Sequence, residues 1–263
     1  MLRALTLACG LLAAAPLPLA AEVPDGVVSV RLLPGWRTDT GTHMAGLEIQ
    51  LAPGWKTYWR APGDAGIPPS FQWSDVDNVS AMNLHWPVPE VHHINGMRSI
   101  GYTGTVVIPI EFTVGSTGVA HIGGNVELGV CSDICMPVEV PISADLPVGG
   151  TREPVIIAAL TDRPLSGAEA GVRSANCNLS TRSGDMVLRA EIRMPPAGNG
   201  EEVVIESGSP SLWVGDPMVT RSGDSLIAEA PIAPMNGDGI ALNRSAVRIS
   251  VFSGTRAVEI DGC

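Results

Sequence analysis

The pair Cys131 and Cys135 constrains the fold more than any other feature of this sequence. The residues on both sides of it are rich in valine and alternate in polarity, which is typical of β-strands. A disulfide needs Cα atoms about 4.4–6.8 Å apart, whereas residues four positions apart on one strand would lie roughly 13 Å apart. If the pair is bridged, the intervening Ser-Asp-Ile must form a tight turn. The sequence therefore predicts that the cysteines lie at the tip of a strand-turn-strand unit.

Such a short ring removes little entropy from the unfolded chain, so the bridge contributes little stability. Thiol-disulfide exchange explains the close cysteine pair better than a stabilising role does. In that reaction one thiolate attacks a disulfide, and a nearby second cysteine resolves the mixed disulfide. Asp133 lies between the two cysteines, and a neighbouring carboxylate disfavours the thiolate. No basic residue lies within the motif, so we expect modest reactivity that depends on a partner. The residues alone leave a purely structural disulfide open as the alternative.

The first 21 residues have the features of a cleaved signal peptide. A short cationic start precedes an apolar run over residues 4–15 and a small-residue cleavage site at 19–21. The run is too short for a comfortable membrane span, and no later stretch approaches about 18 apolar residues. We therefore expect an exported protein without membrane insertion. The mature chain would keep an even number of cysteines, which suggests an oxidising compartment: Cys131, Cys135, Cys177 and Cys263.

The composition favours turns over long helices and argues against one class of partner. The chain has 30 glycines and 22 prolines among 263 residues. Its formal net charge is −11, and Lys56 is its only lysine. Nucleic acid binding needs a basic face, so we expect no nucleic acid partner.

The spacing of strand-like segments predicts an all-β fold. In residues 22–147 they recur about every 8–12 residues, which is typical of a β-sandwich. The expected strands cover residues 26–33, 43–51, 79–86, 105–114, 119–130 and 137–146. Residues 62–69 are rich in proline and glycine and predict a long ordered loop.

A linker over residues 148–170 should carry one short helix that starts at Pro154 and stops at Pro164. Residues 171–263 predict a second, smaller β domain. Its expected strands cover residues 186–194, 218–221, 226–230, 247–251 and 257–260. A structural disulfide between Cys177 and Cys263 would close a long loop and so stabilise the fold by on the order of 4 kcal/mol. The alternative is that Cys263 is a free thiol.

Two adjacent histidines, His92 and His93, lie in a segment whose composition predicts a loop. They could be simply exposed to solvent, or they could cover the cysteines and tune them. A third interpretation is copper(I) binding by the cysteines, helped by Met97 and Met136, because copper(I) prefers soft sulfur ligands. Zinc is disfavoured, since no second close Cys/His pair accompanies the first. We expect no cofactor and no resident metal.

Three blocks, residues 54–64, 100–102 and 129–137, resemble the N-terminal periplasmic domain of the thiol:disulfide interchange proteins DsbD and ScsB. The resemblance covers roughly residues 25–147. It implies an immunoglobulin-like β-sandwich, followed here by a second, smaller β-sandwich. It also implies a periplasmic location. In that family the cysteine pair accepts electrons from a membrane-embedded partner domain and passes them to periplasmic disulfide proteins.

The resemblance also implies roles for particular residues. Cys131 and Cys135 would be catalytic, with Cys135 as the attacking thiol. By position, residues 90–102 would form the cap loop that shields the pair until a partner docks. From the residues themselves we hypothesise that the apolar Ile94 and Met97 lie over the cysteines. The residues of this cap and pocket would be Tyr58, His92, His93, Ile94, Asn95, Met97, Tyr102 and Asp133.

The sequence departs from the full-length reductases in lacking a multi-helix membrane section and a thioredoxin-like domain. We therefore expect a separate membrane electron donor and periplasmic redox partners. The expected function is electron relay to or from these partners, in the manner of a protein-disulfide reductase or oxidoreductase. Two alternatives stay open, namely a copper(I)-binding module that uses the same cysteines and a non-catalytic β-sandwich interaction protein.

Overall fold

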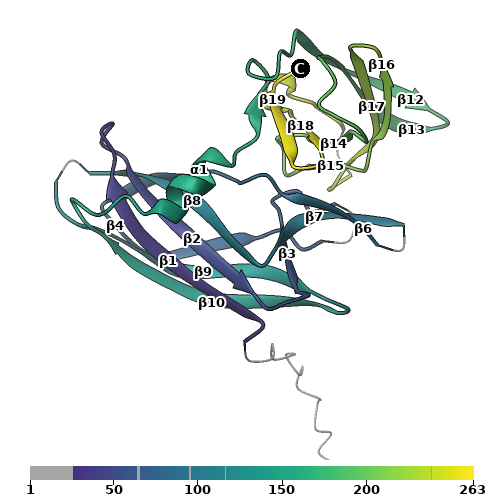
Figure 1. The fold of residues 1–263 in the computed structure, drawn as a ribbon. Helices are drawn as coiled ribbons and strands as arrows, with labels where there is room; N and C mark the ends of the chain where they lie inside the picture. The colour runs from purple at the N-terminus through teal and green to yellow at the C-terminus, as the bar shows by residue number, and fades with distance from the viewer. Residues whose placement is uncertain (1–25, 64–65, 95, 116, 238) are drawn as a thin grey trace, which may run out of the picture.

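The computed structural model describes residues 26–63, 66–94, 96–115, 117–237 and 239–263. The predicted signal peptide lies outside these residues. The described chain is all-β, as the sequence predicts, with a single short α-helix between two groups of strands (Figure 1). No helix within the described ranges is long and apolar enough to cross a membrane.

The first group of strands forms two sheets that pack face to face. One sheet has the order β1 (Val28–Arg37), β2 (His43–Leu51), β8 (Thr105–Val114) and β5 (Val79–Leu84). The other has the order β10 (Cys135–Leu146), β9 (Ala120–Cys131), β3 (Lys56–Tyr58), β7 (Met97–Thr103) and β6 (Glu90–Ile94). An additional strand, β4 (Ser70–Asp77), pairs with β9.

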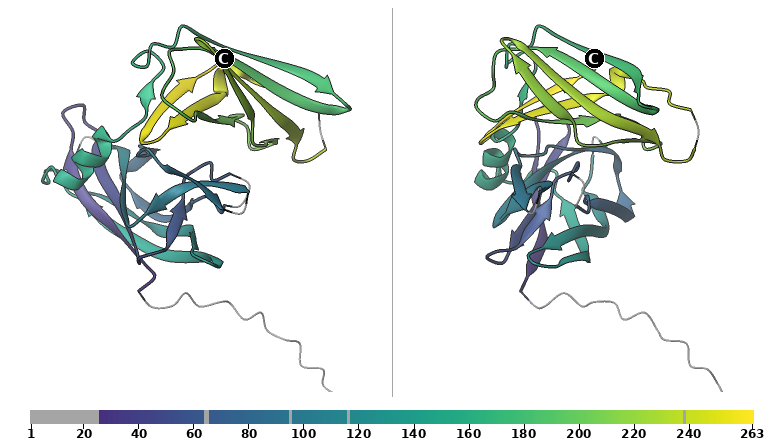
Figure 2. Two further views of the ribbon diagram at one scale, coloured as in Figure 1. Left: turned by 45° about the vertical axis from the view of Figure 1, so that its right-hand side comes forward. Right: turned by 90° about the vertical axis from the view of Figure 1, so that its right-hand side faces the viewer.

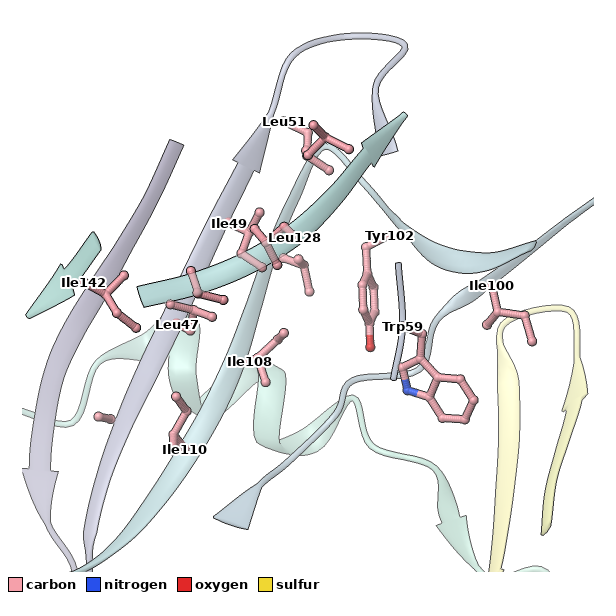
Figure 3. Close-up of a cluster of buried hydrophobic side chains, with 14 of the residues drawn as sticks. Leu47, Ile49, Leu51, Trp59, Ile100, Tyr102, Ile108, Ile110, Leu128 and Ile142 are labelled. Atoms are coloured by element: carbon pink, nitrogen blue, oxygen red, sulfur yellow. The ribbon is translucent and has the colours of Figure 1, made fainter. Parts of the chain in front are cut away.

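The alternation of apolar side chains along these strands builds the core. Every second residue of a strand points to the same face, so Leu47 and Ile49 of β2 meet Leu128 of β9 between the sheets (Figure 3). All three are at most 1 % exposed. Burial of such a side chain contributes about 1.5–3 kcal/mol, so these contacts hold the two sheets together.

The predicted strands 43–51 and 105–114 coincide with β2 and β8, and the other four predicted strands overlap β1, β5, β9 and β10. The described part of the predicted loop 62–69 contains no strand or helix. The structure corrects the sequence analysis at β3, β4, β6 and β7, none of which was predicted. Two of these strands, β6 and β7, form a hairpin where the sequence predicts the cap loop.

The predicted short helix is confirmed as α1 (Pro154–Thr161), which has proline in its first turn. Its Ile156 is fully buried against Trp36, Met44 and Val107 on the outer face of the first sheet. A Cβ atom at Gly46 would lie 2.9 Å from Ile156, so the helix sits this close only because β2 has glycine there.

The second group of strands also forms two sheets around a core of its own. One has the order β11 (Leu165–Ser166), β19 (Arg256–Asp261), β18 (Arg248–Ser253) and β14 (Glu202–Glu206). The other has the order β12 (Ser174–Arg182), β13 (Asp185–Arg193), β17 (Ser225–Pro234) and β15 (Leu212–Val214), with β16 (Met218–Ser222) paired to β17. β11 lies within the predicted linker, and the domain boundaries at 147 and 171 stay predictions.

A disulfide joins Cys177 of β12 to Cys263, across 86 positions of the sequence. Cys177 is 3 % exposed and belongs to the second core. The bridge therefore fastens the end of the described chain to β12, an edge strand of the second of these sheets.

The two groups of strands lie side by side (Figure 2). Arg60, which follows β3, makes contacts between them. Its guanidinium donates to Glu206 at 2.9 Å and to Glu259 at 2.5 Å. It also lies 4.1 Å from the ring centroid of Trp59, which packs edge-on against Phe252. One side chain of the first sandwich is thus held by two carboxylates of the second.

Replacing Arg60 with Met should weaken the attachment of the two sandwiches. The substitution leaves two half-buried carboxylates without their shared cation, which costs about 2 kcal/mol or more. We expect a lower thermal midpoint and faster proteolysis of the linker near α1. The matched control is Arg152→Met, because Arg152 is exposed and contacts only Asp39 at 3.4 Å among the ion pairs of the described residues. Equal thermal midpoints and equal cleavage rates for the two variants would contradict the role of Arg60 in joining the two sandwiches.

Replacing Cys263 with Ser should lower the thermal midpoint of the second sandwich. The unfolded chain then regains the freedom that a bridge across such a loop removes, worth about 4 kcal/mol. Differential scanning calorimetry of the oxidised variant and parent measures this loss. A variant as stable as the parent would show that the bridge is not structural.

Candidate functional site

The turn between β9 and β10 brings the two cysteines together. The strands pair in continuous register from Ala120 and Leu146 to Cys131 and Cys135, which lie directly opposite each other. The Ser132 N–H donates to the Ile134 carbonyl at 3.2 Å and closes the turn. A disulfide joins the cysteines with a Cα–Cα distance of 4.1 Å.

The two sulfur-bearing residues differ sharply in exposure. Cys131 is 0 % exposed, whereas Cys135 is exposed at the start of β10. Ile134 beside it is 70 % exposed, and Asp133 is also exposed in the turn. An incoming protein therefore meets Cys135 and an apolar side chain first, while Cys131 lies behind them.

Tyr58 of β3 contacts both sulfurs. Its hydroxyl oxygen lies 2.8 Å from Cys131 Sγ and 3.3 Å from Cys135 Sγ. Burial raises the pKa of this phenol, so it stays a hydrogen-bond donor at neutral pH. A Cβ atom at Gly129 would lie 2.9 Å from the Tyr58 ring, so the glycine leaves room for the ring to reach the disulfide.

The β3 strand also brings Lys56 to the site, which the sequence analysis missed. Lys56 is the direct cross-strand neighbour of Cys131, and Tyr58 lies two positions along on the same face. The Lys56 ammonium donates to Ser99 at 2.9 Å and lies 5.9 Å from the centroid of the Tyr58 ring. Lys56 and Cys131 are far apart in the sequence, so their pairing could not be predicted. The only available signal was that Lys56 belongs to the block 54–64, which carries the family resemblance.

The expected cap loop is a hairpin that extends away from the disulfide. Thr103 of β7 lies opposite Lys56, at the level of Cys131, whereas Met97 lies at the other end of β7. Six strand positions span about 20 Å. Ile94 and Met97 are 52 % and 53 % exposed at the hairpin tip, so the expectation that they cover the cysteines is wrong for this structure. Asn95 lies outside the described residues.

The hairpin instead contacts the second sandwich. His93 Nε2 lies 2.8 Å from Glu202, and Arg98 donates to the Val203 carbonyl at 3.0 Å and also to Asp216. His92 lies opposite Ser99, and burial lowers the pKa of its imidazole. The prediction that both histidines lie in a loop is wrong, since β6 contains them.

Two further predicted residues lie away from the sulfurs. Tyr102 belongs to the core on the opposite face of the sheet (Figure 3), where its hydroxyl donates to the Pro87 carbonyl at 2.9 Å. Met136 packs against the same core. Met97 lies at the far hairpin tip, and Met136 follows Cys135 directly but packs its side chain against the core. Among the described residues no group of three or more His, Cys, Asp or Glu side chains could hold a metal ion.

A second polar cluster lies on the β9–β10 surface. His121 Nδ1 lies 2.7 Å from Asp145, a contact that raises the pKa of the imidazole, and its Nε2 lies 3.5 Å from both Ser143 and Asp75. The strand register brings these residues together, although nothing in the sequence indicates it. Because both carboxylates are exposed, by 75 % and 78 %, water screens the cluster and it forms no enclosed site.

Comparisons with known proteins agree with this geometry. Residues 29–147 match the family model described as thiol:disulfide interchange protein DsbD, N-terminal. The crystal structure of the N-terminal periplasmic domain of ScsB from Proteus mirabilis superposes with a TM-score of 0.65 at 24 % identity. That match covers 91 % of this chain and 94 % of the other, so the likeness in fold extends over both sandwiches. No curated protein sequence matches the chain.

Tyr58→Phe should slow reduction of the Cys131–Cys135 disulfide by about tenfold or more. The variant keeps the ring but loses the hydrogen bond to the departing thiolate, and a bond to a charged group is worth about 1.5–3 kcal/mol. Stopped-flow reduction by a small dithiol at fixed pH measures the rate. Tyr102→Phe is the matched control, because it removes the hydroxyl of the only other tyrosine in the sequence, which lies on the core side. If both variants react at the parent rate, the Tyr58 hydroxyl does not assist the reaction.

Proposed function

We propose that this chain relays electrons between partner proteins through Cys131 and Cys135, because residues 29–147 match the family model of the DsbD N-terminal domain, a thiol:disulfide interchange module. The observation that carries the proposal is the unequal environment of the two sulfurs. Cys135 is exposed at a hairpin tip, and Cys131 is buried against a tyrosine hydroxyl. This difference in exposure supports attack on Cys135 and departure of Cys131.

In the reducing half-reaction, a thiolate of the donor protein attacks Cys135 Sγ. The Cys131–Cys135 bond breaks, its electron pair stays on Cys131 Sγ, and a mixed disulfide forms between the donor and Cys135. The Tyr58 hydroxyl, already 2.8 Å from Cys131 Sγ, donates to the thiolate that forms. A second donor thiolate then attacks the donor sulfur of the mixed disulfide and releases Cys135. The donor leaves oxidised, and this protein has gained two electrons and two protons.

The oxidising half-reaction runs through the same intermediate. The Cys135 thiolate attacks a disulfide of the acceptor, and Cys131 then attacks Cys135 to release the reduced acceptor. We propose that both partners are periplasmic redox proteins and that the electrons come from a separate membrane donor. The periplasmic location of the similar ScsB domain supports the same location for this chain.

The alternatives receive less support from the site. A copper(I) module would need further soft ligands near the sulfurs, whereas Met97 is exposed at the hairpin tip and Met136 packs against the core. A non-catalytic interaction protein would not need one exposed and one buried sulfur. Thiol-disulfide exchange uses both features, so it is the function we propose.

Equilibration of the oxidised protein in glutathione redox buffers tests this function. We expect a reversible two-electron couple with a potential between about −270 mV and about −120 mV, the values of thioredoxin and of a strong periplasmic oxidant. Cys131→Ala should trap a mixed disulfide on Cys135, whereas Cys177→Ala with Cys263→Ala should leave the couple unchanged. Alkylation followed by mass analysis measures each species.

A disulfide that stays closed across all buffers would contradict the proposed exchange. Stoichiometric copper(I) uptake that Cys131→Ser abolishes, without a reversible couple, would favour the metal-binding alternative instead.

A further inference from the structure

The exchange reaction leaves a negative charge on a buried sulfur. Cys131 is 0 % exposed, so water cannot solvate its thiolate as it would at the surface. Burial in apolar surroundings raises the pKa of a thiol, and a poor leaving thiolate slows exchange. The Tyr58 hydroxyl supplies a dipole but no charge. A nearby cation would therefore accelerate the step in which Cys131 departs.

The strand register places the cationic residue Lys56 opposite Cys131. Directly opposed residues of an antiparallel pair have Cα atoms about 4.5–5.5 Å apart, and their side chains share a face. Lys56 and Cys131 are such a pair, and the Lys56 ammonium lies 5.9 Å from the ring of the tyrosine that contacts the sulfur. This lysine is the only one in a chain whose formal net charge is −11.

The hydrogen-bond partner of Lys56 is neutral. Its ammonium donates to Ser99, and no carboxylate of the described residues forms an ion pair with it. Most cations of the described chain, such as Arg60 and Arg98, are instead paired with Glu or Asp. In the oxidised protein, therefore, no ion pair among the described residues neutralises the positive charge of Lys56.

We propose that Lys56 is a charge-stabilising residue of the exchange reaction. It lowers the free energy of forming the Cys131 thiolate and so makes Cys131 the leaving group. The inference rests on the proposed function. The groups that face Lys56 from the neighbouring strands are Tyr58 on β3, Ser99 on β7, His92 on β6 and Cys131 on β9. Glu90 lies 3.4 Å from His92, and Asp133 lies in the exposed turn. Lys56 supplies the positive charge on this face, and both carboxylates oppose it.

The test compares reduction rates of the Cys131–Cys135 disulfide by a small thiol in the full chain. Lys56→Met and Lys56→Gln should each slow reduction by about threefold to tenfold, because the leaving thiolate loses its charge partner. Lys56→Arg should restore most of the rate, and added salt should slow the parent more than the neutral variants. Arg152→Met is the matched control, since it removes one exposed positive charge from the start of the linker.

A pH titration separates charge stabilisation from a structural role. In a Cys135→Ala background, thiolate absorbance should show that Lys56→Met raises the pKa of Cys131, while the thermal midpoint changes little. Equal reduction rates and equal thiolate titrations for Lys56→Met, Lys56→Gln and the parent would overturn the inference but leave the proposed function intact. Failure of the parent itself to be reduced reversibly would overturn both.

Discussion

The antiparallel pairing of β9 with β10 is the constraint on which the site depends. Its unbroken register turns the valines of both strands toward the core and fixes Cys131 opposite Cys135 at the end of the ladder. A slip of one residue would move every side chain of a strand to the other face. The same pairing that builds the sandwich therefore also sets the geometry of the disulfide, so fold and chemistry cannot be separated here.

The neighbouring strand β3 makes the two ends of the disulfide unequal. It is only three residues long, yet it brings Tyr58 to the sulfurs and Lys56 beside Cys131. On its other side it pairs with β7, whose Arg98 contacts the second sandwich, and Arg60 follows it directly. The second sandwich therefore contacts both β7, which pairs with the strand of the tyrosine, and Arg60, which follows that strand. These contacts connect the second sandwich physically to the site.

The sequence predicted the long strands because their alternating apolar residues report burial directly, as in β2 and β8. It could not predict β3, whose three residues show no period and which forms only because β7 and β9 flank it. The hairpin of β6 and β7 differs from the predicted loop, since the two adjacent histidines interrupt any apolar alternation along β6. The family resemblance supplied Tyr58, but only the strand register revealed that Lys56 adjoins Cys131.

In the proposed reaction, an incoming thiolate bonds to Cys135 and expels Cys131. The most direct measurement is a rapid acid quench of the unmodified protein during its reaction with glutathione, followed by peptide mapping of the trapped mixed disulfide. The exposure of Cys135 and the burial of Cys131 predict that glutathione is found on Cys135. Glutathione mainly on Cys131, or shared equally between the two, would contradict the account.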